Sequence, residues 1–143
     1  MSWTLDSCIN STNQGFGFTI DLNDSGNVIA IGAAESDING TDSGTTEIYD
    51  FSGSSWVQKG DSIHGEEEDR SGISVKLSAN GDIVAIGAYL NDAGGSVTNN
   101  RGNTKIYKYV DGNWTQMGSN INGESAGDHS GTCIAMSKTG TLV

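Results

Sequence analysis

The 143-residue sequence lacks proline, has only seven lysine and arginine residues, and contains no long apolar run. The basic residues are scattered singly among 18 acidic ones and give a net charge of −11. Because no basic cluster could neutralise a phosphate backbone, we expect no nucleic-acid partner. No stretch approaches the roughly 18 apolar residues that span a bilayer, so we expect no membrane insertion. The N-terminus also lacks the basic start and apolar run of a signal peptide.

The hydrophobic content is low, at 34%, and glycine is abundant, at 21 residues. Many short strands joined by glycine, asparagine, aspartate and serine turns produce this composition. Low hydrophobicity also occurs in disordered chains, but the regular apolar clusters at residues 28–31 and 83–86 argue against disorder. The composition therefore favours an all-β protein.

The sequence repeats itself. Residues 17–33 return as residues 72–88 and begin a third time at residues 131–143. A period of this length indicates a modular array, so the repeat is the structural unit. We divide the chain into a leading segment, residues 1–14, followed by unit 1 (15–70), unit 2 (71–129) and unit 3 (130–143).

Each full unit is predicted to form four short strands. The first strand, at residues 18–22 and 73–77, alternates apolar and polar side chains. A glycine turn leads to the second strand, at residues 28–33 and 83–88, which is apolar at nearly every position and is therefore expected to be covered on both faces.

A polar loop, at residues 35–43 and 91–101, follows the second strand of each unit. The third strand is expected at residues 44–51 and 102–109, and the fourth at residues 55–60 and 113–118. Four strands of this length form a sheet that cannot bury both faces alone. Stacking successive sheets around an axis buries them, which predicts β-propeller blades, about two and a half per chain. A single β-sandwich is the competing architecture.

Several residues recur at positions typical of a known repeat: Phe16 and Gly17 before the first strand, residues 30–33 and 85–88 in the second, Ile48–Tyr49 and Ile106–Tyr107 in the third, and Trp56 and Trp114 in the fourth. The units thus resemble the FG-GAP-type repeats of integrin α-subunit propellers and of related bacterial and marine repeat proteins. The resemblance covers essentially the whole chain. The proline of the family's Gly-Ala-Pro signature is replaced by Ala34 and Tyr89, and its Phe-Gly pair by Ser71 and Ser130 with the following glycines.

Trp3 matches Trp56 and Trp114, so residues 1–14 are expected to supply the outer strand of a preceding or composite blade. Unit 3 stops partway into its second strand. An open array exposes apolar faces at both ends. The chain is therefore either an excerpt of a longer propeller or part of an oligomer. We favour self-association, for example a twofold dimer with six blades.

Cys8 and Cys133 occupy different positions in the repeat. We expect two buried or half-buried side chains, and a disulfide between them is the alternative.

The resemblance implies a calcium site between the first two strands, where family members place alternating oxygen ligands. Unit 1 offers a partial match in Asp21, Asn23 and Ser25. The corresponding residues are Lys76, Ser78 and Asn80 in unit 2, and Ala135, Ser137 and Thr139 in unit 3. We therefore expect no cofactor, with calcium at the first loop as the alternative to an ordinary hairpin turn.

A second acidic group is expected on the edge where the loops after the second and fourth strands meet. Its members are Asp37, Asp42, Glu66, Glu67, Glu68, Asp69, Asp92, Glu124 and Asp128. This group is either a binding surface on a rigid scaffold or solubilising charge. One residue separates each of Asp69 and Asp128 from the Ser-Gly pair that follows. These two aspartates can instead cap the turn into the next strand.

The repeated tryptophans are expected to pack between blades, with sugar stacking as the alternative. His64 and His129 have no serine or cysteine at a spacing typical of a nucleophile–base pair, so we assign no catalytic residue. The resulting hypothesis is a non-catalytic, integrin-like segment for adhesion or recognition of a protein or glycan. The alternatives are a carbohydrate-binding propeller and a fragment of a secreted hydrolase. An extracellular or cell-surface location is implied by the resemblance alone.

Overall fold

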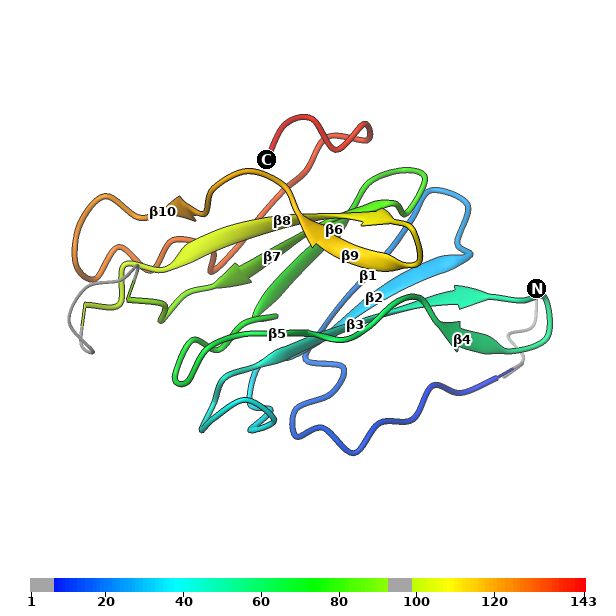
Figure 1. The fold of residues 1–143 in the computed structure, drawn as a ribbon, viewed down its shortest axis with the longest axis horizontal. Helices are drawn as coiled ribbons and strands as arrows, with labels where there is room; N and C mark the ends of the chain where they lie inside the picture. Colours follow the sequence, from blue (N-terminus) through cyan, green and yellow to red (C-terminus); the bar gives the residue numbers. More distant parts are fainter. Residues whose placement is uncertain (1–6, 93–98) are drawn as a thin grey trace, which may run out of the picture.

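The computed structural model describes residues 7–92 and 99–143, and in these ranges all regular structure is β. They hold no helix that could cross a membrane. The strands form two antiparallel sheets with the same strand order (Figure 1). Sheet 1 contains β1 (Thr19–Leu22), β2 (Val28–Ala33), β3 (Thr45–Phe51), β4 (Trp56–Gln58) and β5 (Ile63–His64). Sheet 2 contains β6 (Ser74–Leu77), β7 (Ile83–Ala88), β8 (Asn103–Val110), β9 (Asn113–Gln116) and β10 (Ile121–Asn122).

The strand registers define two faces on each sheet. Opposed residues of neighbouring strands point to the same side. In sheet 1 the leading face carries Ile20 opposite Ile31, with Leu22 two residues along. The trailing face carries Ala30 opposite Ile48. Sheet 2 repeats this pattern, with Val75 opposite Ile86 and Leu77 opposite Val84 on its leading face.

The core lies between the two sheets. The leading face of sheet 2 packs on the trailing face of sheet 1, and β1 lies beside β6. The buried cluster contains Val28, Ala30, Ile48 and Ile63 from sheet 1, and Val75, Leu77, Val84, Ile86 and Trp114 from sheet 2. Neither sheet could bury these side chains alone, so each full unit depends on its neighbour.

The backbones of adjacent units approach closely at the glycine of each second strand. A Cβ built on Gly32 would lie 2.1 Å from the carbonyl oxygen of Gly72, and one on Gly87 would lie 2.0 Å from that of Gly131. Side-chain hydroxyl groups form hydrogen bonds across the same contacts. Thr19 Oγ1 donates to Gly72 O at 2.8 Å, and Ser74 Oγ donates to Gly131 O at 2.7 Å. Unit 3 therefore docks on unit 2 in the way that unit 2 docks on unit 1.

The second strands match their predicted bounds, and both are buried along almost their whole length. The fourth strands do not match. They are shorter than expected, and each is followed by a second short strand, β5 or β10, that also pairs with the third strand of its unit. A turn with Gly60 or Gly118 at positive φ separates the two pieces, because glycine readily takes this conformation.

The expected strands of unit 3 are absent from residues 130–143. The physical reason is that the first strand pairs with the second, of which unit 3 has only Leu142 and Val143. The turn is nevertheless kept, since Ser137 N donates to Leu142 O at 2.9 Å, as Ser78 N donates to Ile83 O. Of the leading segment, residues 7–14 form no strand, and Trp3 lies outside the described residues.

The expectation for the cysteines is wrong in one respect. Cys8 and Cys133 are unpaired, and both are exposed rather than buried or half-buried. Cys133 is exposed because it lies on the side of unit 3 that faces away from unit 2, where no further sheet covers it in the described chain.

Candidate functional site

The loops after the second and fourth strands of a unit lie together along one edge of the array. In unit 1, the amide groups of Glu68 and Ser71 donate to the carbonyl oxygens of Thr41 and Ser43, at 2.8 and 3.1 Å. In unit 2, Gly127 N donates to Asn99 O at 2.8 Å and Ser130 N to Arg101 O at 2.8 Å. We call the described residues of these four loops, 35–43, 65–71, 91–92 with 99–101, and 124–130, the loop edge.

Most of the predicted aspartates of the loop edge hold their own loops in place. Asp37 Oδ1 accepts from Asp42 N at 2.8 Å, and Asp92 Oδ1 accepts from the amides of Asn99 and Asn100 at 2.8 and 2.9 Å. Asp128 Oδ2 accepts from Ser125 N at 2.7 Å. These bonds fix the shape of the loop edge and engage these carboxylates in loop structure.

Asp42 forms an ion pair with Arg70, with 3.0 Å between Oδ2 and Nη2. This hydrogen bond is the largest cause that raises the pKa of Arg70. The pair joins the two loops of unit 1, and both side chains are about one-third exposed, so it contributes little stability. Glu66, Glu67 and Glu124 are exposed on the same loops.

Asp69 has a different environment. It is 4% exposed, and its Oδ2 accepts from Glu66 N at 3.0 Å, as in a turn cap. Its Oδ1 accepts from Asn91 Nδ2 at 2.8 Å, and Asn91 Oδ1 accepts from Asn103 Nδ2 at 2.7 Å. Burial raises the pKa of Asp69, and its hydrogen bonds only partly oppose this. This buried polar chain links the loop edge of unit 1 to the third strand of unit 2.

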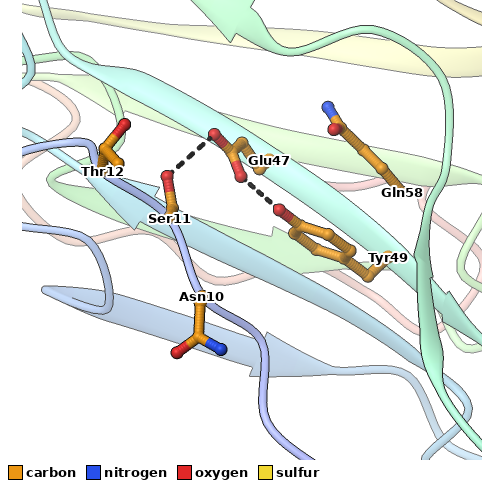
Figure 2. A pocket seen from close by; sticks show the side chains of 6 residues that line it. All are labelled: Asn10, Ser11, Thr12, Glu47, Tyr49 and Gln58. Carbon is orange, nitrogen blue, oxygen red and sulfur yellow. Dashed lines mark hydrogen bonds between the residues drawn. The ribbon is translucent and has the colours of Figure 1, made fainter.

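A second candidate site is a polar hollow of about 400 Å³ between residues 10–12 and strand β3. Figure 2 shows its lining: Asn10, Ser11, Thr12, Glu47, Tyr49 and Gln58. Glu47 is its only acidic lining residue and is 7% exposed. Its Oε1 accepts from Asn13 Nδ2 at 2.6 Å, and its Oε2 accepts from the Tyr49 hydroxyl.

Burial is the main cause that raises the pKa of Tyr49, and Glu47 raises it further. Tyr49 is therefore a neutral hydroxyl at physiological pH, and Glu47 is its acceptor. The hollow offers hydroxyl and amide groups suited to a polar ligand, but its lining holds no second carboxylate for paired acid–base chemistry. Apart from Glu47, which stands where unit 2 has Lys105, no feature of the sequence analysis indicates this site.

In the structure, two residues of the weak calcium match, Asp21 and Asn23, are hydrogen-bonded to other protein groups. Asp21 forms an ion pair with Lys76 Nζ at 2.7 Å and accepts from Leu77 N at 2.7 Å. Asn23 Oδ1 accepts from the amides of Asn27 and Val28, as in a hairpin turn. Among the described residues, no group of three or more His, Cys, Asp or Glu side chains could hold a metal ion.

Trp114 packs between the units as expected. It is 8% exposed, and its Nε1 donates to Lys59 O of unit 1 at 2.7 Å. Trp56, at the open end of the array, is half-buried against Phe51.

The two histidines contact other side chains. His64 Nδ1 lies 3.0 Å from Thr45 Oγ1, and the rings of His129 and Tyr89 pack in a T-shaped arrangement.

Comparison with known proteins adds no family to these observations. No protein-family model matches the chain, and no curated protein does.

Proposed function

We propose that the chain is a segment of an integrin-like β-propeller of the FG-GAP type, acting in recognition or adhesion outside the cell without catalysis. The recurrent junctions between units support the propeller, because the same docking geometry applied repeatedly generates a radial or solenoidal array. The FG-GAP assignment and the extracellular location rest on the resemblance of the repeat.

The loop edge carries the functional part of this proposal. Its backbone is fixed by Asp37, Asp92 and Asp128, while the side chains of Glu66 and Glu124 are exposed to solvent. A preorganised surface of this kind loses little conformational freedom on binding. Its acidic character favours a basic patch on a partner protein.

The test uses the chain immobilised on a biosensor, with purified basic extracellular-matrix proteins as the probes. Binding should weaken in the double variant Glu66→Gln/Glu124→Gln and with added salt. The matched control Asp61→Asn/Asp111→Asn removes the same charge from exposed positions away from the loop edge. Equal binding by both variants would contradict a role for the loop edge.

The polar hollow beside Glu47 favours carbohydrate binding as the second candidate function, because its hydroxyl and amide groups match those of sugars. Binding on a glycan array that is lost in Gln58→Ala and in Trp56→Ala, with folding unchanged, would promote this candidate. Turnover of a glycan by the purified chain, abolished by Asp128→Asn, would instead establish a hydrolase.

A further inference from the structure

The chain contains the same unit-to-unit junction twice, and in each junction a glycine of one unit lies against an aliphatic side chain of the unit before it. A Cβ built on Gly81 of unit 2 would lie 2.6 Å from Val28 Cγ2 of unit 1, and one on Gly140 of unit 3 would lie 2.7 Å from Ile83 Cδ1 of unit 2. The turns are joined by backbone hydrogen bonds, Asp24 N to Ala79 O at 3.2 Å and Ala79 N to Lys138 O at 2.7 Å. These contacts define an interface that recurs between successive units.

Unit 1 has the leading half of this interface, and no other unit packs on it in the described chain. Phe18, Ile20 and Leu22 on its leading face are 58%, 59% and 51% exposed. Val75 and Leu77 of unit 2, the counterparts of Ile20 and Leu22, are 3% and 7% exposed because they pack on unit 1. Gly26, the counterpart of Gly81, has no atom within 4 Å of a built Cβ.

Unit 3 presents the complementary half. Ile134 and Met136 are half-buried toward unit 2, whereas Cys133 and Ala135 alternate with them and are exposed. Leu142 is 73% exposed and holds the repeat position of Val28 and Ile83, the aliphatic residues that receive a glycine of the next unit. Cys133 holds the position of Thr19 and Ser74, whose hydroxyls donate to the next unit.

We propose that the leading face of unit 1 binds the trailing face of unit 3 from a second copy of this chain. The partner's Leu142 packs against Gly26, and the partner's Cys133 lies at the Gly17 carbonyl, which repeats the two internal junctions. The contact is heterologous, so copies join head to tail into a closed ring or an open chain. The occupant is a second copy because the two exposed halves match contacts that this chain already makes with itself.

Sedimentation velocity over a concentration series tests the proposal, with reducing agent present because both cysteines are exposed. The wild-type chain should associate reversibly. Ile20→Lys and Leu142→Lys should each raise the dissociation constant roughly tenfold or more, since burial of a large aliphatic side chain has about that effect. Both positions are exposed in the single chain, so circular dichroism should show unchanged folding.

Two controls make the result specific. Val57→Lys changes a similarly exposed aliphatic residue on the trailing face of sheet 1, which the proposed contact does not use, and it should not affect association. Gly26→Ala should weaken association, whereas Gly53→Ala should not, although both glycines have positive φ and open space for a Cβ. An equimolar mixture of Ile20→Lys and Leu142→Lys should associate better than either variant alone, because one wild-type junction can form between them.

Three outcomes would overturn the proposal. The first is a wild-type monomer at every concentration, which would leave these faces to a different partner or to further repeats. The second is association that Ile20→Lys leaves unchanged. The third is association that Ile20→Lys weakens and Leu142→Lys does not, which would mean that two leading faces pair with each other.

Discussion

At the scale of single residues, Asp69 is distinctive because its carboxylate is buried and hydrogen-bonded to the amide groups of Glu66 and Asn91. Its pKa lies above the ordinary value of 3.8, chiefly because burial disfavours the charged form. The folded protein therefore holds the Asp69 proton more tightly than the unfolded chain does. Ionised Asp69 costs stability above its folded-state pKa, and this cost disappears as the pH falls from that pKa toward 3.8.

Asp69→Asn should destabilise the protein by about 1–3 kcal/mol at neutral pH, because an amide cannot accept from both Glu66 N and Asn91 Nδ2. The difference between wild type and variant should grow as the pH is lowered, since only the wild type gains stability by protonation here. Urea unfolding at a series of acidic pH values measures this. Asp128→Asn, which removes the same cap at an exposed position, is the control. A difference that does not change with pH would contradict the account.

Calcium binding at the first turn gives a second residue-scale prediction. Asp21 is already bonded to Lys76 and Leu77, and the Asn23 side-chain oxygen accepts two amides of its own turn. Millimolar calcium should therefore leave the melting temperature unchanged, because no ligand set is free to bind it. A rise of several degrees that is abolished by Asp21→Asn would contradict this and establish a calcium site.

At the scale of strands, the second strand of each unit must approach the next unit without a side chain between them. Gly32→Ala should destabilise the protein by about 1–3 kcal/mol, because its methyl group would overlap the Gly72 carbonyl and overpacking of a tight contact costs this much. Gly112→Ala has open space at its Cβ but takes φ +91°, so it measures the cost of a strained backbone without any overlap. Thermal or urea unfolding that shows no loss of stability for Gly32→Ala would contradict the close approach.

The strands differ in how far the sequence predicts them. Residues 28–33 and 83–88 are found at the predicted bounds because an uninterrupted apolar run is a strong local signal. β5 was missed because Ile63 is a lone apolar residue after a turn, and its pairing with Thr46 depends on the tertiary structure. Unit 3 carries the pattern of a first strand, but its second strand is too short to pair with it, so neither strand forms.

The sites follow the same division. A turn-capping role for Asp69 and Asp128 is predicted for the turn into the next strand, but their carboxylates accept from the amides of Glu66 and Ser125, three residues earlier in the chain. The hydrogen-bonded chain from Asp69 through Asn91 to Asn103 could not be predicted, since it joins three separate elements.

The environment of Lys59 likewise depends on tertiary structure. It is 8% exposed, lies between Asp50 and Asp82, and sits over the ring of Tyr109.

At the scale of the whole molecule, the central claim is that each unit is stabilised by its neighbour rather than by its own sheet. Leu22 and Leu77 test it directly because they are the same residue at the same repeat position. Leu77 is 7% exposed against unit 1, and Leu22 is 51% exposed at the open end. Within residues 7–92 and 99–143, Leu77 has a neighbouring unit to pack on and Leu22 has none.

The decisive measurement is the free energy of unfolding of Leu77→Ala and Leu22→Ala, determined by urea at a concentration low enough to keep the chain monomeric. Leu77→Ala should cost about 2–5 kcal/mol, as for a buried leucine, and Leu22→Ala no more than about 0.5 kcal/mol. Equal losses for the two variants would contradict stacking of the units and would mean that each sheet is stable by itself.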